Sequence, residues 1–201
     1  MSSAIPINGH ARRRQETAAR IVMAAGTLFG ERGVAETTVG DICERAGVAR
    51  QTFFNHFATK QDLTNALVHV GADFFLAAID TAIREGGTTR ERLERLFAEI
   101  HVAASSAGPM HQDLVTEVVR ASYQVVTPER TRALDGAVAK LVRAGRAHGD
   151  VSRAHAVDDQ VALVIGAFHH LLLEWTRRKA FPIAARAARM ARMLADVLAP
   201  R

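Results

Sequence analysis

One segment, residues 17–63, constrains the fold more than any other part of the chain, because it spells three short helices joined by tight turns. Apolar residues from Ala18 to Phe29 recur at three- and four-residue spacing. This spacing predicts a first helix with a single apolar face. Gly33 is expected to end that helix in a left-handed glycine cap, with Val34 as the hydrophobic contact that often follows such a cap.

A second helix and a turn follow within a few residues. This helix is expected to begin at Thr37 or Thr38, because Thr38 and Asp41 have the spacing of a capping box. Gly47 then supplies the positive φ that a short helix-turn-helix connection requires. The exposed face of the third helix is rich in side chains of the kind that read base edges, and it comprises Arg50, Gln51, Thr52, Phe54, Asn55 and His56.

These residues resemble the signature of the TetR family of bacterial transcriptional regulators. The resemblance covers about a quarter of the chain and rests on Leu28-Phe29, Gly33, Thr37-Thr38-Val39, Asp41-Ile42, Ala46-Gly47-Val48, Thr52, His56-Phe57 and Lys60 through Leu63. Two positions depart from the family pattern. Phe54 stands where the family usually has a tyrosine whose hydroxyl reaches a DNA phosphate, and Ala49 stands where a serine commonly caps the third helix.

The resemblance implies a ligand-responsive transcriptional regulator, a repressor that binds a palindromic operator in double-stranded DNA as a homodimer. On this hypothesis Arg50, Gln51 and Thr52 reach base edges. Phosphates are held by Thr38, Asn55, His56 and Lys60, and Lys60 is aided by the positive N-terminal end of its own helix. Phe54 belongs to the same surface but lacks the phenol.

Composition agrees with a polyanionic partner. The chain has 201 residues, is 48% hydrophobic and carries a net charge of +5. Its first 60 residues hold eight Lys and Arg against five Asp and Glu, so the excess charge is concentrated there. The run Arg12-Arg13-Arg14 could lie along or in a minor groove, or form a solvated tail. The first twenty residues lack the apolar region of a signal peptide, and we expect no membrane-spanning run and a cytoplasmic protein.

The rest of the chain predicts an all-α body. Thr59 is expected to cap a fourth helix that is apolar on two sides and joins the head to the body before Gly86-Gly87. Further helical patterns follow at about 90–105, 109–122 and 128–147, without β alternation. We therefore expect a flexible basic N-terminal arm over 1–16, a helix-turn-helix domain over 17–60, and a ligand-binding and dimerisation domain over 61–201.

Two apolar stripes near the C-terminus have coiled-coil-like spacing. One consists of Val161, Ile165, Phe168, Leu172 and Trp175, and the other consists of Ile183, Ala187, Met190, Leu194 and Val197. Two such helices can pair with a second copy into a four-helix bundle, or they can simply close the core of one chain. Periodicity leaves both alternatives open. The family resemblance favours the dimer, because similar proteins pair through their final two long helices.

The sequence gives weaker guidance on small-molecule sites. A small, mainly apolar effector is expected among the middle helices, lined by Phe75, Phe97, His101, Met110, Glu117, Tyr123, Phe168 and His169. The nine histidines lack zinc-ligand spacing, so neither a metal nor a cofactor is expected, and no catalytic set indicates an enzyme. Cys43 is interpreted as a small core residue. A helical small-molecule binding or sequestering protein without DNA activity is the main alternative.

Overall fold

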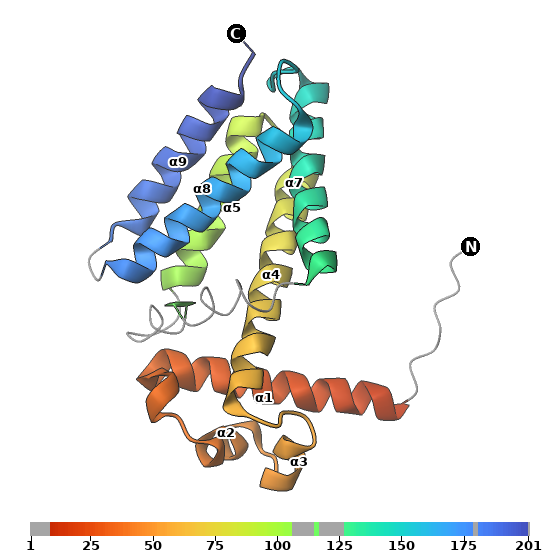
Figure 1. Cartoon of the computed structure of the whole chain (residues 1–201), viewed down its shortest axis with the longest axis vertical. Coiled ribbons are helices and arrows are strands. Elements are labelled where there is room, and N and C mark those ends of the chain that lie inside the picture. Colours follow the sequence, from red (N-terminus) through yellow and green to blue (C-terminus); the bar gives the residue numbers. More distant parts are fainter. Residues whose placement is uncertain (1–8, 106–114, 117–126, 179–180, 201) are drawn as a thin grey trace.

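The computed structural model describes residues 9–105, 115–116, 127–178 and 181–200, and all regular structure in these ranges is helical. The predicted all-α class is therefore confirmed. Figure 1 shows α4 running from a small head at one end of the molecule into a larger helical body at the other. The helices are α1 (Gly9–Glu36), α2 (Val39–Ala46), α3 (Arg50–Phe54), α4 (Lys60–Arg84), α5 (Thr89–Ser105), α7 (Pro128–His148), α8 (Val157–Arg177) and α9 (Ile183–Leu198).

The turns of the head form through the predicted local contacts. Thr38 caps α2: its hydroxyl accepts from the Asp41 amide at 3.2 Å, and the Thr38 amide donates to the Asp41 carboxylate at 2.8 Å. Gly47 ends α2 in the left-handed conformation, with φ 63° and ψ 44°. No side chain caps α3, because its N-cap residue is Ala49. The helix-turn-helix is thus encoded by capping residues close to it in sequence.

The first helix differs from the expectation at both ends. Gly33 has a positive φ of 87°, but its ψ of 161° is extended, so it kinks α1 instead of ending it in a left-handed cap. The buried Thr37 hydroxyl donates to the Gly33 carbonyl at 2.8 Å and supports this kink. At the other end, residues 9–16 are helical, with Arg12 and Glu16 paired one turn apart, whereas a flexible arm was expected there. Figure 1 shows α1 projecting well beyond α2 and α3.

Two hydrophobic clusters share one helix. The head cluster contains Phe29, Ile42 and Phe53, which are inaccessible to solvent, and it includes Leu63 from the first turns of α4. The body cluster includes Phe75 and Ile79 from the later turns of α4, together with residues of α5, α7, α8 and α9. Each large side chain buried in this way stabilises the fold by about 1.5–3 kcal/mol. The prediction that α4 joins head to body is therefore confirmed, but the two clusters contact its two ends and not two full-length sides, because Val70 and Phe74 of one predicted side are exposed.

Helix α4 contradicts the expectation that the chain contains no apolar run long enough to span a membrane. It contains an 18-residue window with a mean hydropathy of 1.6, and by length and composition alone it could cross a membrane. A mostly buried core helix of a soluble protein can meet the same criterion, but only 22% of this window is buried within the chain. Here α4 carries Leu63 into one core and Ile79 into another, which accounts for part of this apolar character. Val70 and Phe74 remain exposed on its outer side.

The apolar stripes of α8 and α9 mostly close the core of the single chain. Val161, Trp175, Ile183, Ala187 and Leu194 are buried in the body cluster, and Ile165, Phe168, Leu172 and Met190 pack against it. These residues therefore close the core of one chain, which was one of the two alternatives that the periodicity left open. The same spacing also serves a helix packed within its own chain.

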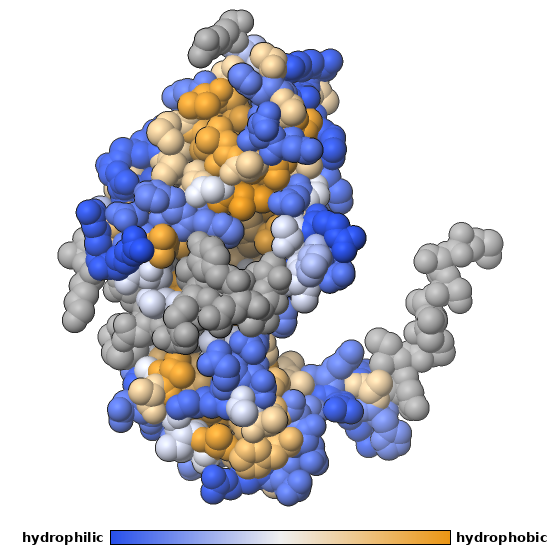
Figure 2. All heavy atoms as spheres, viewed as in Figure 1, coloured by the Kyte–Doolittle hydropathy of each residue, from blue (hydrophilic) through white to orange (hydrophobic). Residues whose placement is uncertain are grey.

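A different side of the two C-terminal helices remains exposed. It includes Leu163 on α8 and Met193 and Val197 on α9. Figure 2 shows hydrophobic residues gathered on the upper part of the molecule, over the region where α8 and α9 lie in Figure 1. The apolar surface of these helices is therefore only partly used within the chain.

Candidate nucleic-acid interface

Helix α3 presents one polar, exposed face and one buried residue. Phe53 is fully buried in the head, which fixes the rotation of α3 about its axis. At about 100° per residue, Arg50, Gln51, Phe54 and Asn55 then fall on a single exposed arc. The Gln51 side-chain amide donates to the Asn55 side-chain oxygen at 3.3 Å. This arc carries hydrogen-bond donors and acceptors and a cation in a form that a DNA major groove can accept.

Phe54 is the apolar member of this arc. Its residue is 48% exposed. Its ring meets the buried Phe53 ring edge to face, with centroids 5.3 Å apart and planes at 84°. Phe53 in turn contacts Phe57 at 6.1 Å between centroids. Edge-to-face contacts are favourable, so the exposed ring is positioned by a buried aromatic residue.

Other predicted DNA contacts have different surroundings. Thr52 and His56 are half-buried beside the exposed arc. Thr38 is exposed, but its hydroxyl donates to Asp41 at 2.7 Å as part of the α2 cap. Hydrogen bonds from the Thr38 side chain and backbone, with Arg32 adding its charge, hold the pKa of Asp41 below its usual value. The cap is consequently intact at neutral pH and weakens as the pH falls through that lowered pKa.

Lys60 is directed into the protein. Its ammonium donates to the carbonyl oxygens of Val34 at 2.6 Å, Thr37 at 3.1 Å and Ala35 at 3.4 Å. An ammonium has three donors, so these contacts use all of them. They supply donors to carbonyls that follow the kink in α1, at the end of a helix where carbonyls commonly lack helical partners. The lysine expected to bind phosphate instead joins the start of α4 to the end of α1.

A basic segment of α1 adds to the exposed surface of the head. Arg12, Arg13, Arg14 and Arg20 are all exposed on the projecting part of the helix, and Glu16 is the one acidic residue between Gly9 and Arg20. The charge was recognisable from the sequence, but its helical arrangement was not. A helix fixes the spacing of these cations more closely than a flexible arm would.

The predicted ligand residues are only partly described. Phe75 on α4 stacks on Phe168 of α8 with ring centroids 4.0 Å apart, and Phe97 is buried in the same cluster. His169 lies at the surface next to this pair, where partial burial lowers its pKa. Met110, Glu117, Tyr123 and the side chain of His101 lie outside the described residues. In the described part of the chain, three aromatic residues of the predicted ligand site, Phe75, Phe97 and Phe168, therefore lie in one cluster.

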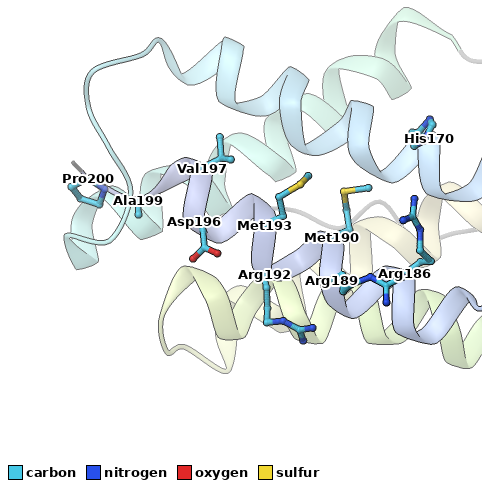
Figure 3. Close-up of a pocket in the computed structure, with 10 residues that line it drawn as sticks. All are labelled: His170, Arg186, Arg189, Met190, Arg192, Met193, Asp196, Val197, Ala199 and Pro200. Carbon is cyan, nitrogen blue, oxygen red and sulfur yellow. The ribbon is translucent and has the colours of Figure 1, made fainter.

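Two surface hollows lie away from these aromatic residues. A groove of about 370 Å³ between α4 and α5 includes Phe74, Thr81 and Arg95. A larger groove, of about 930 Å³, lies along α9 and reaches His170 of α8. In Figure 3, Met190, Met193 and Val197 lie on the side of α9 toward α8, whereas Arg192 and Asp196 point the other way. Met190 and Val197 of the predicted stripe on α9 line this groove.

Val197 was predicted in the same stripe as the buried residues of α9 but is exposed, and the sequence did not single out Leu163 or Met193 beside it. A spacing of four residues relates Arg189, Met193 and Val197, but a stronger apolar stripe on the same helix obscured this signal. Within the ranges that the structure describes, no group of three or more His, Cys, Asp or Glu side chains could hold a metal ion. Cys43 is buried in the head, and burial raises the pKa of its thiol.

Comparison with known sequences gives a consistent result. A sequence profile described as "Bacterial regulatory proteins, tetR family" matches residues 21–67. The HTH-type transcriptional regulator TtgR of Pseudomonas putida is 30% identical over 171 residues, which cover 79% of this chain and 81% of that protein. The HTH-type transcriptional repressor KstR2 of Mycobacterium tuberculosis is 33% identical over 73 residues, 36% of each chain.

Solved structures share the fold. A TetR-family transcriptional regulator from Pectobacterium atrosepticum superposes with a TM-score of 0.73 at 22% identity, covering 94% of this chain and 97% of that one. FadR of Thermus thermophilus, a TetR-family repressor in complex with lauroyl-CoA, superposes with a TM-score of 0.64 at 21% identity, covering 92% and 96%. These likenesses concern the arrangement of the helices.

The contacts of Lys60 generate a stability prediction. Lys60→Met removes the ammonium and leaves carbonyls of Val34, Ala35 and Thr37 without this donor. Hydrogen bonds of charged groups contribute about 1.5–3 kcal/mol, so the free energy of unfolding, measured by urea denaturation at pH 7, should fall by about that amount. Lys140→Met, at an exposed position of α7, is the matched control and should change it by less than about 0.5 kcal/mol. Equal effects of the two substitutions would contradict the assignment.

Proposed function

The chain belongs to the TetR family of bacterial regulatory proteins, and from this premise we propose that it reads operator DNA with the exposed arc of α3. Regulators of this family are ligand-responsive, DNA-binding repressors that act as dimers, so the chain is a transcriptional regulator and not an enzyme. We assign residues 17–60 to DNA binding and residues 61–201 to ligand binding and dimerisation. As a regulator of bacterial genes, it works in the cytoplasm.

The observation that carries this assignment is the burial of Phe53 beside an exposed polar arc. It supports a major-groove position in which Arg50 and Gln51 reach base edges from the start of α3. Thr52, Asn55, His56 and Thr38 are assigned to the rim of the contact, where phosphates lie. For Lys60 we propose a positioning role, because its ammonium is occupied by backbone carbonyls.

The projecting part of α1 supplies a second, sequence-independent contact. Its arginines form an exposed cationic segment at the side of the head. Arginine binds phosphate through charge and paired donors, and each phosphate that is neutralised releases counterions. We therefore assign Arg12, Arg13 and Arg14 to the DNA backbone flanking the bases that α3 reads.

Selection from randomised duplex DNA tests the function as a whole. The purified protein should enrich a two-fold symmetric sequence, since a symmetric dimer presents two copies of α3 to the major groove. Hydroxyl-radical footprinting of the enriched duplex should protect two half-sites centred about 34–36 Å apart or at a multiple of that distance. A failure to enrich any duplex would favour the helical small-molecule binder without DNA activity.

Arg50 generates a specificity prediction. If its guanidinium donates to a base, Arg50→Ala should weaken binding to the selected duplex by about 1–3 kcal/mol and should change binding to random duplex DNA little. Fluorescence anisotropy at a fixed salt concentration measures both. Arg143→Ala, an exposed arginine of α7, controls for the loss of one positive charge. A similar loss on both duplexes would reassign Arg50 to the phosphate backbone.

For the dimer we propose an interface on the exposed side of α8 and α9, in place of the buried stripes. Met193 and Val197 are 51% and 60% exposed, although both are apolar. With Met190 they line the groove along α9, and His170 of α8 lies across from them (Figure 3). Arginines at the edge of this groove, including Arg189, suit the polar rim of an interface with an apolar centre.

Substitution of Met193 distinguishes this interface from the buried stripes. Met193→Asp places a carboxylate on the exposed side of α9, which the single chain tolerates but an apolar interface does not. Sedimentation equilibrium should show a monomer with nearly unchanged helicity. Met23→Asp, at a methionine of α1 that is also exposed, should remain dimeric. A Met193→Asp protein that dimerises as tightly as the wild type would place the interface elsewhere.

The effector site is assigned to the body, next to the stacked Phe75 and Phe168. Two aromatic faces offer apolar contact, and His169, whose pKa is lowered by partial burial, lies beside them. The match to FadR, which was solved with lauroyl-CoA, supports a ligand with a substantial apolar part. The remaining predicted lining residues, Phe97, His101, Met110, Glu117 and Tyr123, stay part of this proposal.

A further inference from the structure

The position of Phe54 points beyond the general assignment of α3 to DNA. Resting on the proposed function, we propose that Phe54 reads thymine: its ring contacts the 5-methyl group of a thymine in each half-site of the operator. Phe54 thus determines sequence specificity, a role distinct from the phosphate contact that a tyrosine makes at this position in similar proteins.

The helical phase of α3 places Phe54 between the two residues proposed to read bases. Phe54 lies four residues after Arg50 and three after Gln51, so its side chain emerges between theirs on the same face. Phe53, about 100° from Phe54 around the helix, is fully buried and prevents α3 from rotating this face away. Any docking that brings Arg50 and Gln51 to base edges therefore brings the Phe54 ring to the floor of the same groove.

The chemistry of the Phe54 ring limits what it can contact in the groove. A phenyl group has no donor or acceptor, so it cannot bind a phosphate oxygen or recognise a polar base edge. In the major groove, the apolar feature that distinguishes one base from the others is the 5-methyl group of thymine. A large apolar side chain kept nearly half exposed on a polar surface gains stabilisation only when a partner covers it.

Neighbouring side chains hold the Phe54 ring in place. Phe54 rests edge to face on Phe53, and Phe53 contacts Phe57, so a chain of aromatic contacts links the exposed ring to the head core. On the polar side, the Gln51–Asn55 hydrogen bond spans the same turn of helix. A ring supported in this way loses little conformational freedom on binding, which allows a small contact such as one methyl group to discriminate between bases.

Replacement of thymine by uracil tests this inference directly, because it removes the methyl group and leaves base pairing unchanged. Duplexes carrying the sequence obtained by selection are synthesised with each thymine replaced singly by deoxyuridine. The wild-type protein should lose about fourfold in affinity at one thymine position per half-site, the value of burying one methyl group. Replacing the symmetric pair should cost about sixteenfold.

The variant Phe54→Ala assigns the effect to the ring. At the same positions it should bind the thymine and uracil duplexes with equal affinity, which separates a lost contact from a change in DNA shape. Met23→Ala, which truncates an exposed apolar side chain elsewhere on the head, should retain the wild-type discrimination. Circular dichroism verifies that both variants are folded.

The outcomes separate this inference from the function on which it rests. Specific binding that is unaffected by uracil at every position would overturn the thymine contact and leave the regulator intact. Discrimination that persists in Phe54→Ala would also overturn it, because another residue would then read the methyl group. Failure to select any duplex would instead remove the proposed function itself.

Discussion

The junction between head and body depends on the three hydrogen bonds of Lys60. They join the first residue of α4 to the carbonyls that end α1, so the direction in which α4 leaves the head is fixed by backbone contacts. Leu63, one turn later, enters the head core and reinforces this direction. Together, the charge-assisted hydrogen bonds and the buried leucine make α1, α2, α3 and the start of α4 one unit.

The far half of α4 belongs to a different unit. Phe75 and Ile79 are buried against the body, and Arg130 of α7 donates to the His69 carbonyl at 2.9 Å near the middle of the helix. A ligand at the proposed site beside Phe75 and Phe168 would therefore act on a helix whose other end packs in the head, which carries the proposed DNA-binding arc. Two copies of α3 must enter successive major grooves about 34–36 Å apart, so a small tilt of α4 alters the fit.

Local features could be predicted from the sequence, and features that depend on distant residues could not. The Thr38 cap and the Gly47 turn involve residues within a few positions of each other. The partners of Lys60 lie more than twenty residues away, so its sequence context indicated only a cation at a helix start. The stripes that begin at Val161 and at Ile183 have a spacing that serves equally for a chain's own core and for a dimer. Helical spacing did place Arg50, Gln51 and Asn55 on one face, because Phe53 beside them is an unambiguous core residue.

Coupling between the two ends of α4 is tested most directly by measuring effector affinity with and without operator. An effector is first identified by thermal-shift screening of small apolar molecules, and its dissociation constant is then determined calorimetrically for the free protein and for the protein saturated with the selected duplex. Linkage requires the operator to change effector affinity by the same factor by which the effector changes operator affinity, commonly about 5- to 150-fold. A shift in this range is the predicted result. Identical affinities in the two states would contradict a regulator in which α4 transmits ligand binding to DNA.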